Sequence, residues 1–157
     1  PRSAYAHRML GTRLLRWGRA REAVGPLERA ADLDPAHAET WNGLAMARYH
    51  AAERPGAERA FRSGLARHPD HSGLRLGLAA LLVNDARYEE ALATYDALLE
   101  RAPTFAPAHV GRGILLHELG RRDEAEAAFV RAVEVARRPG RFRRRLEAYR
   151  RLRRADD

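Results

Sequence analysis

Seven histidines are the side chains of this sequence best suited to bind a metal ion or to move a proton near neutral pH. His68 and His71 flank a Pro69-Asp70 turn, and His109 and His117 lie two helical turns apart. Neither spacing brings two imidazoles to one ion without further ligands. The sequence therefore predicts histidines that pack or face solvent, and we expect no metal and no cofactor.

Paired carboxylates, which can serve as a general acid and a general base, occur at Glu89-Glu90 and at Asp123-Glu124 with Glu126. Each group opens an expected helix, where negative charge is stabilised by the helix dipole. The chain has no cysteine, and it has no nucleophile elbow, P-loop, dinucleotide fingerprint or His-Glu-x-x-His motif. We therefore expect no catalytic residues and no enzyme activity in this chain, although a catalytic domain could be attached in a parent protein.

Arginine is concentrated at the C-terminal end. All 29 basic residues are arginine; residues 137–157 contain 10 of them against 3 acidic residues, whereas residues 1–136 contain 19 against 18. A basic surface of this kind attracts nucleic acid, acidic protein or anionic lipid. The candidate basic patch consists of Arg141, Arg143, Arg144, Arg145, Arg150, Arg151, Arg153 and Arg154.

The same segment has an apolar stripe at helical spacing, formed by Phe142, Leu146, Tyr149 and either Leu152 or Arg153. This pattern predicts that residues 140–157 contain a basic amphipathic helix that caps the end of the molecule. We favour the capping role over nucleic-acid binding, because no base-stacking aromatics are interleaved with the arginines.

The elements that position these residues follow an internal period of 34, and such a period decides the architecture. Pro35, Pro69 and Pro103 keep this spacing. Four alanines keep it as well: Ala23, Ala57, Ala91 and Ala125. The period predicts four units at residues 4–37, 38–71, 72–105 and 106–139.

Small and large side chains occupy fixed columns within the units. The small column on the first helix is Gly11, Ala45, Ala79 and Gly113, and the large column on the second helix is Leu27, Phe61, Tyr95 and Phe129. Small residues let two helices approach, and large ones fill the joint to the next unit. With the run Trp41-Asn42-Gly43-Leu44-Ala45, these columns resemble the tetratricopeptide repeat (TPR) family over residues 4–139.

The resemblance implies an all-α fold, a right-handed α-solenoid of antiparallel helix hairpins. We expect first helices near 4–17, 38–51, 72–84 and 106–119, and second helices near 20–32, 55–67, 88–101 and 122–136. Asp34 and Pro35 are expected to begin a helix as N-cap and first-turn proline. Arg48 and Arg112 stand in apolar columns, and we expect their guanidinium groups to reach solvent. His109 shares the column of Trp41, which predicts a structural role for it.

In the TPR family, five positions of each first helix point into a concave groove. On these positions the resemblance places the groove candidates Tyr5, Arg8, Thr12, Asn42, Met46, Tyr49, His50, Leu76, Ala80, Val83, Asn84, Val110, Ile114 and His117. Leu76, Val83, Val110 and Ile114 are expected to form an exposed apolar patch for a partner. The alternative is that they are core, or that the C-terminal segment of the chain covers them.

Polar groove candidates suggest how a ligand could be held. Asn42 and Asn84 could bind a peptide backbone, because an amide side chain both donates and accepts. His50 and His117 could make binding depend on pH. The co-chaperone members of the family hold the C-terminal tails of chaperones with a clamp of basic side chains and Asn. This chain resembles that clamp only at Arg8, so we expect no binding of chaperone tails.

The sequence thus predicts a protein-interaction module that binds a peptide or protein segment in its groove. Two alternatives stay open: anion or nucleic-acid binding through the arginine-rich helix, and a structural scaffold for self-assembly or for an attached catalytic domain. No stretch of the sequence is apolar enough to suggest a transmembrane segment. We expect a soluble fragment of a longer or processed protein, with the compartment open and the cytoplasm favoured.

Overall fold

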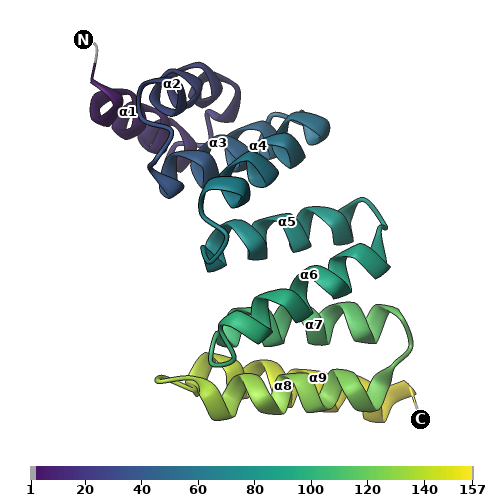
Figure 1. The fold of residues 1–157 in the computed structure, drawn as a ribbon. Helices are drawn as coiled ribbons and strands as arrows, with labels where there is room; N and C mark the ends of the chain where they lie inside the picture. Colours follow the sequence, from purple (N-terminus) through teal and green to yellow (C-terminus); the bar gives the residue numbers. More distant parts are fainter. Residues whose placement is uncertain (1–2, 157) are drawn as a thin grey trace. The chain divides into compact units, whose positions relative to one another are not determined.

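The computed structural model describes residues 3–156 and the side chains of residues 3–153. Within that range every regular element is an α-helix, and short turns join the helices (Figure 1). The helices are α1 (Ala4–Arg16), α2 (Ala20–Leu33), α3 (Ala38–His50), α4 (Arg54–Arg67), α5 (Ser72–Asn84), α6 (Tyr88–Arg101), α7 (Ala106–Glu118), α8 (Arg122–Val135) and α9 (Gly140–Asp156). The predicted all-α fold of helical hairpins is confirmed. The chain forms two compact parts, residues 1–81 and 82–157, which we describe separately.

Each hairpin closes through a turn with one residue in the left-handed region of backbone conformation. The φ angle is 74° at Gly18 and Gly120, 66° at Ala52 and 56° at Ala86. These residues are 34 apart, so the turn repeats with the sequence period. The two glycines adopt this conformation at little cost, whereas it is costly for the two alanines, which have a Cβ atom.

Glycine allows close contact where one hairpin meets the next. A Cβ atom at Gly77 of α5 would lie 2.4 Å from the Phe61 ring of α4, and one at Gly111 of α7 would lie 2.5 Å from the Tyr95 hydroxyl oxygen of α6. The large column therefore fills the joint between successive hairpins, as predicted. The glycines opposite it form a second small column, which the sequence argument did not identify.

A side-chain donor closes the turn between successive hairpins. Trp41 Nε1 donates to Pro35 O, Arg75 Nη2 donates to Pro69 O, and His109 Nε2 donates to Pro103 O. The Trp41 bond is 2.8 Å long and the His109 bond 2.9 Å. Because a carbonyl oxygen only accepts, His109 must have its proton on Nε2. The structural role predicted for His109 is confirmed.

Arg48 and Arg112 are half-buried, so the expectation that their guanidinium groups reach solvent is wrong. Arg48 forms an ion pair with Glu28 and donates to Gly56 O over 3.2 Å. Arg112 Nε donates to Asp96 Oδ1 over 2.7 Å. A charge that leaves bulk water needs a partner, and each carboxylate comes from the preceding hairpin. These ion pairs therefore join successive hairpins.

Asp34 and Pro35 do not begin a helix, contrary to the expectation from sequence. Asp34 is the C-cap of α2, and α3 begins at Ala38 with His37 as its N-cap. The Asp34 carboxylate instead accepts a hydrogen bond from Ala36 N over 3.2 Å. An Asp side chain that bonds two residues ahead stabilises a turn, which explains its place between the helices.

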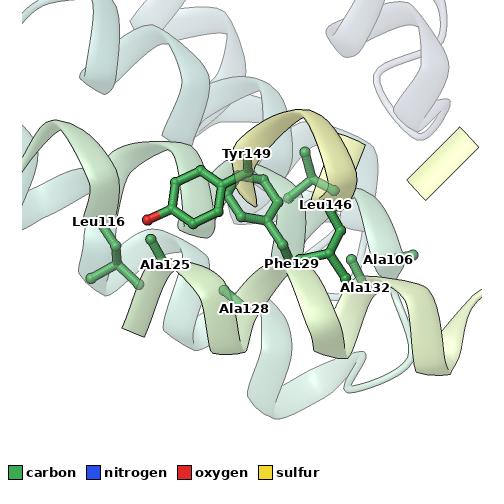
Figure 2. Close-up of a cluster of buried hydrophobic side chains, with 9 residues drawn as sticks. Ala106, Leu116, Ala125, Ala128, Phe129, Ala132, Leu146 and Tyr149 are labelled. Carbon is green, nitrogen blue, oxygen red and sulfur yellow. The ribbon is translucent and has the colours of Figure 1, made fainter. Parts of the chain in front are cut away.

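Helix α9 packs on the last hairpin through a buried apolar stripe. Leu146 and Tyr149 point towards Phe129 of α8, and the rings of Tyr149 and Phe129 are 4.8 Å apart (Figure 2). The Tyr149 hydroxyl donates to Arg122 O over 3.0 Å. The predicted capping helix is confirmed.

Arg153, and not Leu152, continues the buried stripe of α9. Leu152 is 49% exposed, whereas Arg153 is half-buried and donates to Asp123 and Glu126 of α8 over 2.8 and 2.9 Å. Arg150 donates to Glu126 over 2.7 Å. Ion pairs at the edge of the stripe thus hold α9 to α8.

Candidate partner-binding surfaces

In residues 1–81, the predicted groove residues lie on α1, α3 and α5, the first helices of their hairpins. We call them the A-helix face. Its exposed members are Tyr5, Thr12, Met46, His50 and Ala80, and its half-buried members are Arg8, Asn42, Tyr49 and Leu76. Tyr5 is 64% exposed and Met46 is 37% exposed. Apolar contact area is thus available on this face outside the core.

Aromatic rings on the A-helix face contact neighbouring charged or imidazole groups. The Arg8 guanidinium lies 5.3 Å from the centre of the Tyr5 ring. The Tyr49 and His50 rings meet edge to face at 5.3 Å, and the Arg54 guanidinium lies 5.7 Å from the Tyr49 ring. Such aromatic and arginine groups are enriched at protein interfaces, because they combine apolar area with hydrogen-bonding capacity.

Asn42 faces a place where α5 has no side chain. Its amide nitrogen lies 3.9 Å from the point that a Cβ atom would occupy at Gly73. Nearby, His71 Nδ1 accepts from Leu74 N, so the ring proton is on Nε2, which donates to Glu39 over 3.1 Å. The His71 contact helps to position α5 beside α3, and it gives this histidine a structural explanation.

In residues 82–157, α9 covers much of the predicted groove. Val110 is only 8% exposed and lies in the cluster that contains Leu146, so its predicted exposure is wrong. Ile114 packs against the same cluster. The His117 ring meets Tyr149 edge to face at 5.4 Å. The alternative that the C-terminal segment covers these residues therefore holds for α7.

The two remaining groove candidates lie at the C-terminal end of α5. Val83 is half-buried and Asn84 is exposed. They belong to the second compact part.

The predicted basic patch divides into two groups of arginines. Arg150 and Arg153 form ion pairs with α8. The other described members are exposed and have no ion-pair partner within residues 3–153: Arg141, Arg143, Arg144, Arg145 and Arg151. The side chain of Arg154 lies outside the described residues. Only the second group is available to a partner.

A cavity of about 780 Å³ opens where α8 ends and α7 and α9 begin. Phe105, Val135, Ala136 and Phe142 line its apolar part. Arg137, Arg138 and Arg141 line its basic part, and the Arg141 guanidinium lies 4.5 Å from the centre of the Phe142 ring. Its volume is within the range of ligand pockets, roughly 300–1,000 Å³.

Sequence reasoning missed this cavity, although one departure from the repeat marks it. Arg137 stands 34 residues after Pro103, where the pattern calls for a fourth proline. Ala136, the C-cap of α8, has an extended backbone with φ −79° and ψ 128°. The chain therefore leaves α8 in a different direction from α2, α4 and α6, and the two arginines that follow line the cavity.

Sequence reasoning also missed an apolar surface on α1. Leu10 is 49% exposed, whereas Leu44 and Leu78, at the same place in the period, are buried. Met9 of α1 and Trp17, the C-cap that follows this helix, are exposed as well. The period places Leu10, Leu44 and Leu78 in one column, so the period alone gives no sign that Leu10 differs.

Potential metal-ligand side chains are dispersed over the described residues. Within them, no three His, Asp or Glu side chains lie close enough together to hold a metal ion. No helix in the described part of the chain is both long and apolar enough to cross a membrane. Burial raises the pKa of Tyr95 to about 12, which keeps this core phenol protonated.

Comparison with known proteins gives consistent matches. Two sequence profiles described as tetratricopeptide repeat match the chain, one at residues 53–109 and 85–153 and the other at residues 8–56. The protein CTR9 homolog of Arabidopsis thaliana is 30% identical over 108 residues, which are 68% of this chain and only 10% of that protein.

Solved structures share the fold. A thermophilic TPR protein of Thermus thermophilus has a TM-score of 0.78 and 25% identity, covering 94% of this chain and 81% of its own. MamA of Desulfovibrio magneticus RS-1, from residue 41 to its end, has a TM-score of 0.75 and 22% identity, covering 98% and 86%. At this identity the MamA match is a likeness of fold alone.

Proposed function

Because the chain belongs to the tetratricopeptide repeat family, whose members mediate protein–protein interactions, we propose that its A-helix face binds a peptide or protein segment of a partner. The role is binding and not catalysis. One observation carries the proposal: α1 and α3 expose Tyr5 and Met46 while their opposite sides are buried in the core.

The chemistry of the A-helix face suits an extended segment of polypeptide. Tyr5 and Met46 supply apolar area, and methionine adapts its shape to varied partners. Asn42 is half-buried and can both donate to and accept from a peptide group. Thr12 and His50 are exposed beside them on the same helices and supply further polar contacts. A face that alternates apolar anchors with polar groups can fix both the position and the direction of a bound chain.

Affinity capture with a matched pair of double variants tests this function. We expect the immobilised wild type to retain a partner from a lysate of the source organism, and the M46E/A80E variant to lose it, because two carboxylates would enter the A-helix face. The control, L33E/A66E, places the same charges at exposed positions of α2 and α4. Equal retention by wild type and M46E/A80E would refute the proposed face.

A further inference from the structure

The cavity between α7, α8 and α9 combines apolar and basic surface. We call its half-buried residues Phe105, Val135, Ala136 and Phe142 the floor, and its exposed residues Arg137, Arg138 and Arg141 the rim. Arg137, Arg138 and Arg141 are exposed and have no acidic partner within residues 3–153. Elsewhere in the chain, many arginines form ion pairs, as Arg121 does with Glu124 and Arg150 does with Glu126. The rim therefore concentrates positive potential beside apolar surface, and no group in the described part of the chain neutralises it.

The backbone adds to this potential. The helices α7 and α9 both begin at the cavity, at Ala106 and Gly140, and neither has an acidic residue in its first turn. The positive ends of two helix dipoles thus lie near three guanidinium groups, an arrangement that a bound anion would stabilise.

The apolar surface of the floor limits which kind of anion can fill the cavity. Val135, Ala136 and Phe105 give an aliphatic and aromatic surface, and Phe142 lies under its own Arg141. A nucleic acid would need exposed rings on which bases stack and a continuous basic track along its backbone. A small inorganic anion would leave the apolar floor uncovered. A polypeptide that combines carboxylates with leucine or phenylalanine satisfies both the rim and the floor.

We propose that this cavity binds an acidic segment of a partner protein, with an apolar side chain on the floor and carboxylates on Arg137, Arg138 and Arg141. This proposal rests on the proposed interaction function and adds the chemical class of a ligand and a second place of contact. The arginines of α9 thus have two roles: Arg150 and Arg153 hold the helix in place, and Arg141 helps to bind the partner.

Fluorescence anisotropy with short labelled peptides tests the proposal on the whole chain. The probe alternates Glu with Leu and Phe. One matched peptide replaces each Glu with Gln, and another replaces each Leu and Phe with Ser. A thymidine oligonucleotide of the same net charge is the fourth probe. We expect the first peptide to bind at least about tenfold more tightly than the other three.

Two pairs of substitutions separate the cavity from general attraction by the basic helix. R137Q/R141Q removes two charges from the rim, and R144Q/R151Q removes two from exposed positions of α9 outside the cavity. We expect the rim pair to weaken peptide binding about tenfold and the control pair to change it less than about twofold. The A136L substitution, which fills the floor, should also weaken binding, and circular dichroism checks that each variant is folded.

Three results would overturn the proposal: no binding of the acidic apolar peptide, equal losses from the two arginine pairs, or tighter binding of the oligonucleotide. None of them bears on the A-helix face. A partner that M46E/A80E loses and R137Q/R141Q retains would leave the proposed function standing while the cavity proposal fails.

Discussion

At the scale of single residues, the four hairpin turns place the same backbone conformation on two different residue types. Gly18 and Gly120 have no Cβ atom, so a φ of 74° costs them little. Ala52 and Ala86 have φ of 66° and 56°, and a left-handed backbone costs an L-residue with a Cβ atom roughly 1–2 kcal/mol. The turns at the two alanines therefore store strain.

The A52G substitution should stabilise the protein. Relief of the left-handed strain exceeds the extra entropy of glycine in the unfolded chain, so we expect the free energy of unfolding to rise by about 0.5–1 kcal/mol. Urea denaturation measures it. The reverse substitution, G18A, should destabilise by a similar amount, and an unchanged or lower stability of A52G would show that the turn does not hold the strained conformation.

At the scale of helices, contact between hairpins depends on glycine facing a large side chain. The space beside the glycine differs between joints. A Cβ atom added at Gly77 would lie 2.4 Å from the Phe61 ring, whereas one added at Gly43 would lie 3.3 Å from a methyl group of the flexible Leu27 side chain. An aromatic ring packed in a core cannot move as easily as the end of a leucine. The same substitution should therefore have opposite effects at the two places.

The G77A substitution should lower the free energy of unfolding by about 1–3 kcal/mol, because the added methyl group overpacks the joint. The G43A substitution should be neutral or stabilising, because alanine gains about 1 kcal/mol of helix propensity over glycine. Combining F61L with G77A should restore part of the loss. Equal effects of G43A and G77A in urea denaturation would contradict the packing described for these joints.

The contact between α8 and α9 should depend on pH through Glu126. The hydrogen bond from Arg150 to Glu126, then the charge of Arg150 and the hydrogen bond and charge of Arg153, hold the pKa of Glu126 below its ordinary value. A carboxylate with a lowered pKa stabilises the folded state above its ordinary pKa, and this contribution is lost as the pH falls through the folded-state pKa. Acid should therefore loosen α9 before it affects helices without such ion pairs.

The E126Q substitution should lower thermal stability at neutral pH and have a smaller effect in acid below the folded-state pKa of Glu126, where the wild-type carboxyl is itself protonated. Hydrogen exchange at the two pH values, read at the amides of α9, measures the change directly. A difference between wild type and E126Q that is as large in acid as at neutral pH would show that the ion pairs do not set the docking of α9.

At the scale of the whole molecule, periodic and non-periodic features differ in how far sequence predicts them. The helices and the joints recur every 34 residues, so each unit repeats the signal of the others, and helices such as α5 and α6 were predicted from it. The burial of Val110 and the cavity at Arg137 arise where the period ends and α9 replaces the next hairpin. Such places have no second copy in the sequence, and their packing depends on contacts between distant residues.

The partner's identity does not follow from the repeat, because the residues that set the period are the buried ones. The dissociation constant of the captured partner for wild type and the two double variants shows which surface of the protein binds it. We predict at least about tenfold weaker binding by M46E/A80E and less than about twofold change for L33E/A66E. Weaker binding by L33E/A66E, with M46E/A80E unchanged, would place the partner on the second helices and rule out binding at the A-helix face.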